Sequence, residues 1–179
     1  VEGTSATMEA TKVLTGRTLQ AGEFGFELVH VTDEGTKLVA TALNAANGKV
    51  TFTRNYPATM AAGQYKYVMR EVKGNLGGMS YSNAEYWILV TITNNTATGK
   101  LESSVKYYAD QACTQEITDL TTVRFENTYD AQDTTYTPTA TTFKVWAPTA
   151  NAVSVLLYTS GNYGQGYYDT VAMTPGNKG

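Results

Sequence analysis

The chain reads YKYVMRE at residues 65–71, where aromatic and apolar residues alternate with polar ones. Alternation of this kind is typical of a β-strand with one buried face. Successive side chains of a strand point to opposite faces, so Glu71 falls on the same face as Tyr65, Tyr67 and Met69. We therefore expect a carboxyl group inside the core, where it needs a polar partner because burying it alone is costly.

Two further segments carry a polar residue in phase with their apolar residues. Residues 8–14 read MEATKVL, which puts Lys12 on the face of Met8, and residues 123–129 read VRFENTY, which puts Asn127 on the face of Phe125. An amine, a carboxyl and a carboxamide that are all buried are expected to meet one another. The alternative is a Lys12 that extends its amine into water, a Glu71 at a strand edge and an Asn127 in a turn.

Composition favours strands over helices. Thirteen tyrosines and only four prolines accompany an apolar content of 42 %, and we find no run of apolar residues at helical spacing. Short strand patterns recur between turn signals, and Asn47-Gly48 predicts a hairpin. The sequence therefore predicts an all-β fold, a β-sandwich, with strands at residues 7–14, 23–29, 38–42, 49–54, 65–72, 86–92, 101–109 and 123–129.

Charge and residue counts exclude several function classes. The net charge of −3 argues against nucleic acid or an anionic membrane as a partner, and no stretch approaches the length of a membrane span. His30 is the only histidine, so a multi-histidine metal site cannot form, and we also expect no Ser/His/Asp triad. Cys113 is the only cysteine, so no intramolecular disulfide can form. We expect no metal and no cofactor.

The chain divides into two parts. Residues 131–136 are polar and unpatterned and are interpreted as a linker between a first domain, residues 1–130, and a second unit, residues 137–179. The second unit has strand patterns only at 142–146 and 153–158, so we expect an incomplete sandwich that is truncated or leans on a neighbour. The chain also lacks a signal-peptide pattern at its start, and we expect it to be a fragment of a longer protein.

Aromatic residues of the second unit are candidates for stacking on sugar rings. They are Trp146, Tyr163, Tyr167 and Tyr168, and core packing is the alternative role for Trp146.

The first unit resembles the isopeptide-linkage domain of streptococcal major pilins and related Gram-positive surface proteins. The resemblance is carried by ATKVLTGR at 10–17, AGEFGFEL at 21–28, GQYKYVMRE at 63–71 and FENTY at 125–129. It implies an immunoglobulin-like, pilin-type β-sandwich in which an autocatalytic amide bond joins the first strand to the last. By this resemblance Lys12 is the nucleophile, Glu71 the catalytic residue and Asn127 the acceptor.

This chemistry requires a dry site and a neutral amine. Burial lowers the pKa of a lysine and favours the neutral form of a carboxyl. We expect a protonated Glu71 to polarise the carbonyl oxygen of Asn127 while Lys12 attacks and ammonia leaves. The dry environment is expected from the neighbouring aromatic residues Phe24, Phe26, Tyr67 and Phe125.

The second unit resembles the start of the starch-binding-type sandwich that precedes the catalytic barrel of type I pullulanases. The matching residues are 136–138, 141–150, 153–158 and 173–179. This resemblance implies that the chain is a non-catalytic extracellular spacer from a modular starch- or pullulan-degrading enzyme of a Gram-positive cell, with α-glucan as a partner of the complete parent. A pilus or adhesin subunit is the alternative, and a freestanding sugar-binding lectin is the third class.

Overall fold

The computed structural model describes residues 2–130, 135–136, 141–158 and 169–176. Contacts between residues divide the chain into two compact units, Val1–Ala131 and Gln132–Gly179. In the described residues every regular element is a strand, apart from one 3₁₀ turn at Leu120–Thr122. The prediction of an all-β fold is confirmed.

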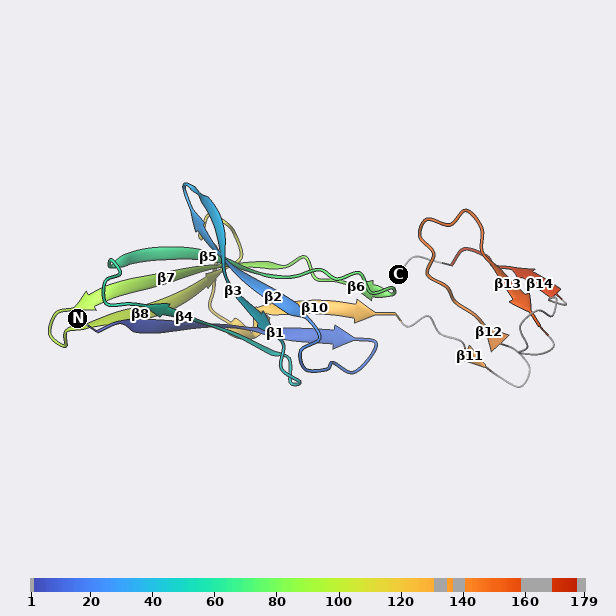
Figure 1. Ribbon diagram of the computed structural model, residues 1–179, viewed down its shortest axis with the longest axis horizontal. Coiled ribbons are helices and arrows are strands. Elements are labelled where there is room, and N and C mark those ends of the chain that lie inside the picture. Colours follow the sequence, from blue (N-terminus) through green and yellow to red (C-terminus); the bar gives the residue numbers. More distant parts are fainter. Residues whose placement is uncertain (1, 131–134, 137–140, 159–168, 177–179) are drawn as a thin grey trace. The chain divides into compact units, whose positions relative to one another are not determined.

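The first unit contains ten strands in two sheets (Figure 1). A four-stranded sheet has the order β4-β1-β10-β6, and a six-stranded sheet has the order β3-β2-β5-β7-β8-β9. The strands are β1 (Thr4–Thr15), β2 (Gly25–Thr32), β3 (Gly35–Leu43), β4 (Lys49–Tyr56), β5 (Gly63–Glu71), β6 (Met79–Ser80), β7 (Glu85–Asn95), β8 (Lys100–Tyr108), β9 (Glu116–Ile117) and β10 (Arg124–Tyr129).

The core lies between the two sheets and follows the predicted alternation. Along β1 the even-numbered residues from Ala6 to Lys12 are buried, whereas Thr7, Glu9 and Thr11 between them are exposed. Phe26, Phe52 and Phe125 are almost fully buried, and a side chain of that size stabilises the fold by roughly 1.5–3 kcal/mol when removed from water. Strand β5 pairs with both β2 and β7, so its inward residues lie in the middle of the larger sheet.

The first and last strands of this unit are neighbours. Strands β1 and β10 pair in parallel, with Lys12 opposite Phe125 and Leu14 opposite Asn127. Parallel pairing requires a long connection between the two strands, and here that connection is nearly the whole unit. The register brings Lys12 and Asn127 close together on one sheet.

The predicted hairpin at Asn47-Gly48 is wrong. A turn does form there, but it leads from β3 in the six-stranded sheet to β4 in the four-stranded sheet, so its flanking strands do not pair. Gly48 has φ 86°, and a Cβ at this position would lie 2.3 Å from the carbonyl oxygen of Lys12. Its own carbonyl accepts a hydrogen bond from the Lys12 N–H at 2.6 Å. The glycine is needed because the turn closes against the backbone of β1.

The described part of the second unit contains two short pairs of antiparallel strands. Strand β11 (Thr135–Tyr136) pairs with β12 (Thr141–Thr142), and β13 (Ser154–Leu157) pairs with β14 (Asp169–Ala172). The strand predicted at 142–146 ends at Thr142, and its apolar residues remain exposed. The proposed linker falls mostly on residues outside the described ranges.

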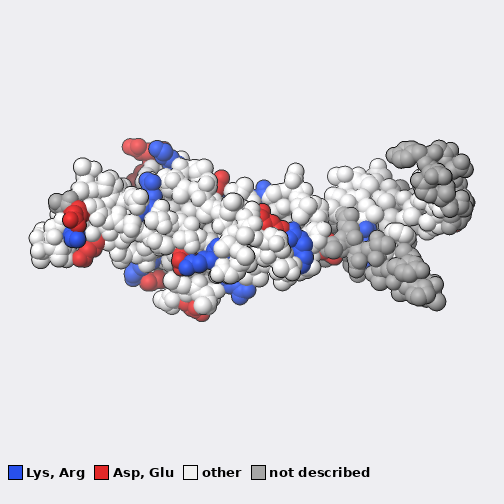
Figure 2. Space-filling model, turned by 60° about the horizontal axis from the view of Figure 1, so that its bottom comes forward, with Lys and Arg blue, Asp and Glu red and all other residues white. Residues whose placement is uncertain are grey.

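Charged side chains are sparse on the face of the first unit that Figure 2 shows. On the face of the first unit in Figure 2, blue and red side chains are interspersed and most of the surface is uncharged. No helix among the described residues is long and apolar enough to cross a membrane.

Candidate functional site

The three polar residues singled out by strand periodicity meet inside the first unit. Lys12 on β1 and Asn127 on β10 belong to the four-stranded sheet, and Glu71 at the end of β5 faces them from the six-stranded sheet. Their exposed fractions are 2 % for Lys12, 7 % for Glu71 and 1 % for Asn127. The alternative of a Lys12 that reaches water and a Glu71 at an edge is therefore wrong.

One carboxylate connects the amine to the amide. Lys12 Nζ donates to Glu71 Oε2 at 2.6 Å, and Asn127 Nδ2 donates to Glu71 Oε1 at 2.7 Å. The side chains of Lys12 and Glu71 are both fully inaccessible to solvent. A buried ion pair of this kind is weak evidence for stability, because desolvating two charges offsets much of their attraction.

The amine lies in aromatic surroundings. Its Nζ is 4.4 Å from the centroid of the Phe24 ring, and Tyr81 packs edge-on against Phe24 at 6.2 Å. Burial lowers the pKa of Lys12, whereas the hydrogen bond and charge of Glu71 oppose that shift. Proton transfer from the ammonium to Glu71 gives the neutral amine that a nucleophile requires.

Of the four aromatic residues expected around the site, Phe24 contacts the amine, and Phe26 and Phe125 lie opposite Glu71 and Lys12 on the neighbouring strands. Phe26 and Phe125 pack at 5.1 Å between ring centroids. Tyr67 is buried but bonds elsewhere, with its hydroxyl 2.9 Å from that of Tyr56.

The orientation of the Asn127 amide differs from the expectation. Its carbonyl oxygen Oδ1 accepts a hydrogen bond from the backbone N–H of Ser82 at 2.7 Å, and its nitrogen faces Glu71. A backbone N–H can only donate, so the oxygen must be the atom that faces Ser82. Glu71 therefore contacts the amide nitrogen of Asn127 rather than its carbonyl oxygen.

Residue 82 escaped the sequence reasoning for a physical reason. It lies in the irregular segment between β6 and β7, and it contributes a main-chain group that any residue except proline carries. No periodicity or residue type could have pointed to it.

Of the predicted sugar-stacking residues, Trp146 lies in the described part of the chain. Trp146 is 52 % exposed, so the described residues do not place it in a core, which was the alternative role expected for it. Tyr163, Tyr167 and Tyr168 lie outside the described residues.

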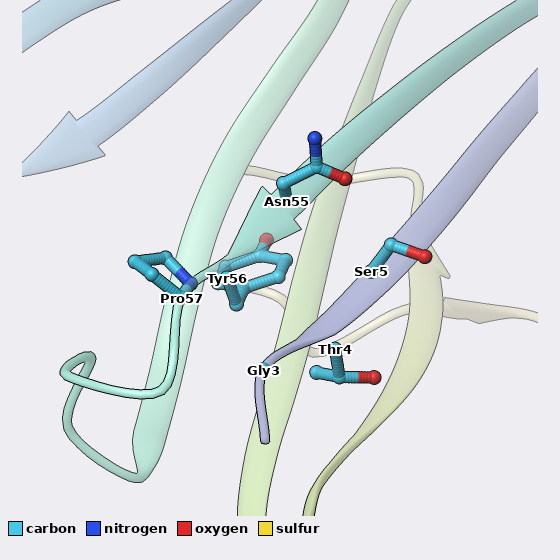
Figure 3. Close-up of a pocket in the computed structure, with 6 residues that line it drawn as sticks. All are labelled: Gly3, Thr4, Ser5, Asn55, Tyr56 and Pro57. Carbon is cyan, nitrogen blue, oxygen red and sulfur yellow. The ribbon is translucent and has the colours of Figure 1, made fainter. Parts of the chain in front are cut away.

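The surface of the first unit also has hollows. One lies where β1 begins and β4 ends, and its lining is uncharged (Figure 3): Gly3, Thr4, Ser5, Asn55, Tyr56 and Pro57. Another is lined in part by Ser82, Arg124 and Glu126. Within the described ranges no group of three His, Cys, Asp or Glu residues is arranged to hold a metal ion.

Comparison with known proteins identifies the family. The family model described as the Spy0128-like isopeptide containing domain matches residues 8–130. The chain belongs to this family and carries a pilin-like isopeptide domain.

Solved structures of one pilin are similar to the chain. The major pilin from Streptococcus pyogenes is 17 % identical, with a TM-score of 0.45, and the match covers 73 % of this chain and 52 % of the pilin. Two mutants of that pilin are 16 % identical, with TM-scores of 0.44 and 0.45, and each match covers 70 % of this chain and 51 % of the mutant. The chain thus spans about half the length of these structures. The search of curated proteins gave no match.

Proposed function

We propose that the chain is an extracellular spacer module that locks itself with an amide bond between Lys12 and Asn127, formed once per molecule with Glu71 as the catalyst. The observation that carries this proposal is the Glu71 carboxylate, which bonds both the attacking and the leaving nitrogen at 2.6 and 2.7 Å. Membership of an isopeptide-containing family supports the same chemistry.

The reaction exchanges one C–N bond for another. After the Lys12 ammonium has passed one proton to Glu71, the neutral Nζ attacks Cγ of Asn127 and a new bond forms. Nζ then loses a second proton to the carboxyl group, and the carboxyl group gives one proton to Nδ2. The Cγ–Nδ2 bond breaks and ammonia leaves. Glu71 ends this exchange with as many protons as it held when the attack began.

The position of the bond suits a load-bearing spacer. It would join the first strand to the last and close a ring of 116 residues, from 12 to 127. A force applied to the two ends of the unit would pass through the new amide bond, so residues 13–126 would carry none of it. Covalent closure would also limit the opening that proteases need.

For the surroundings of the module we propose a Gram-positive cell surface, which the pilin-like family supports. A pilus or adhesin subunit fits this domain directly. The second candidate for the parent protein is a modular starch- or pullulan-degrading enzyme that binds α-glucan. This candidate is supported only by the sequence resemblance of residues 136–179, which lie outside the family match. In that reading, residues 1–130 are the crosslinked domain, 131–136 a linker and 137–179 part of a carbohydrate-binding-type sandwich.

Intact mass spectrometry of three proteins tests the proposal. The wild-type protein should be lighter than its sequence mass by one ammonia, whereas Glu71→Ala and Lys12→Ala should have their full sequence masses. Ammonia loss from Glu71→Ala at the wild-type rate would show that another group is the catalyst.

A further inference from the structure

We infer that the backbone N–H of Ser82 is a catalytic group of the crosslinking reaction, the donor that stabilises the oxyanion formed on Asn127. This inference rests on the proposed Lys12–Asn127 reaction and adds a part to it. The N–H of Ser82 contacts the reacting carbonyl directly, 2.7 Å from Oδ1.

Of the groups around the site, Ser82 is the one that donates a hydrogen bond to the carbonyl oxygen of Asn127. Both oxygens of Glu71 are already engaged, one by Lys12 Nζ and the other by Asn127 Nδ2. Among the described residues, the Ser82 N–H is the sole donor to Asn127 Oδ1. When Nζ bonds to Cγ, the electron pair of the C=O bond moves onto Oδ1, and the negative charge develops where this N–H already points. The charge returns to the carbonyl when the Cγ–Nδ2 bond breaks and ammonia leaves.

The donor is held in place before the reaction. Strand β6 pairs with β10, the strand of Asn127, through Ser80 opposite Thr128, and Ser82 follows two residues later. The Ser82 hydroxyl oxygen accepts the N–H of Ala84 at 3.2 Å, which fixes the turn that leads into β7.

Contacts made by Tyr81 hold the segment between β6 and β7 against the site. The ring of Tyr81 packs against Phe24, which covers the amine, and the Tyr81 hydroxyl accepts the N–H of Leu76 at 3.2 Å. The acceptor of this bond is buried, since only 1 % of Asn127 is exposed, whereas Ser82 itself is half-buried. A donor that is already in place needs little reorganisation, and it stabilises developing charge more strongly where water is excluded, as around the Asn127 side chain.

Two variants that differ only in the backbone N–H of residue 82 measure its effect on the crosslinking rate. Ser82→Ala keeps it, and lactic acid incorporated at position 82 keeps the same side chain but replaces the N–H by an ester oxygen. Both are made by cell-free translation, quenched at intervals and weighed, and the loss of ammonia is timed. Loss of one oxyanion donor slows related reactions about 100- to 1,000-fold, so the ester should crosslink at least about 100-fold more slowly than Ser82→Ala.

A second ester controls for the general effect of removing an amide. The Ala97 N–H donates to Asn95 Oδ1 at 3.1 Å in an exposed turn of the same unit. Lactic acid at position 97 removes a comparable bond far from the reacting atoms in sequence, and should leave the crosslinking rate within about twofold of wild type. Equal rates for Ser82→Ala and the ester at 82 would overturn the inference. If the wild-type protein loses no ammonia, the proposed function fails instead.

If the ester at 82 does not fold, an independent measurement tests the hydrogen bond on which the inference rests. In a Lys12→Met protein, which cannot crosslink, the hydrogen bond should give a scalar coupling between the Ser82 amide nitrogen and Asn127 Cγ in the NMR spectrum. Absence of this coupling in the folded variant would overturn the inference.

Discussion

The thermal stability of a protein that cannot close the ring measures what the proposed bond contributes. The double variant Lys12→Met, Glu71→Gln removes the amine and the carboxylate together, with side chains of similar length. Because neither new side chain is charged, no charge remains uncompensated in the core. The loss of the ring is then the main difference from wild type.

The expected loss of stability follows from the length of the ring. By analogy with disulfides, the chain-entropy model gives a stabilisation of about 5 kcal/mol for a closed loop of 116 residues. For the unit Val1–Ala131, an unfolding entropy of roughly 2.1 cal/mol/K per residue amounts to about 0.28 kcal/mol/K. The melting temperature of the double variant should therefore fall by about 18 °C.

Differential scanning calorimetry of the two proteins, with their masses checked beforehand, provides the assay. The single variant Glu71→Ala serves as a comparison, because it loses the ring and also leaves the Lys12 amine buried without a partner. Removing one member of a buried pair costs about 3–5 kcal/mol, so this variant should melt below the double variant. If the double variant melts within a few degrees of a crosslinked wild type, the ring does not stabilise the fold as argued.

Three further outcomes are expected. Limited proteolysis should leave residues 1–130 intact and degrade the second unit, because its apolar side chains such as Trp146 are exposed; equal survival of both units would contradict this. Burial lowers the pKa of Lys12 in the folded protein below its ordinary 10.5, so between these two values the unfolded chain binds more protons than the folded one. The free energy of unfolding of Glu71→Ala should therefore rise with pH up to about 10.5. The double variant, which lacks Lys12, should not show this rise. In single-molecule stretching, Glu71→Ala should release residues 13–126, up to about 400 Å of chain, and the wild-type first unit should release none of it.

Strand periodicity was sufficient to place the reacting side chains in the core. The face on which Lys12, Glu71 or Asn127 lies is a local property of its strand, because alternation with period two fixes it once a neighbour such as Met8 or Phe125 is buried. The burial of the neighbouring aromatic residues follows from the same alternation. The hydrogen-bonding pattern could not be predicted in this way, and the Asn127 amide lies with its nitrogen toward Glu71 because a main-chain donor claims its oxygen.

The pairing of strands that are far apart in the sequence also could not be predicted from local sequence patterns. Asn47-Gly48 carries a strong turn signal, but whether the strands on either side pair is decided by which sheet each joins. The parallel pairing of β1 with β10 likewise depends on the whole intervening chain. In the second unit, apolar residues from Phe143 to Trp146 gave a strand pattern, yet this stretch continues no strand and stays exposed.

Peptide mapping tests the proposed Lys12–Asn127 bond most directly. Trypsin cleaves after lysine and arginine, and an acylated Lys12 resists cleavage. The crosslinked protein should yield one branched product in which residues 1–17 are joined to residues 125–144, lighter by one ammonia than the two peptides together, with fragment ions that locate the branch at Lys12 and Asn127. Recovery of separate linear peptides 1–12 and 125–144 from the folded protein would contradict the bond.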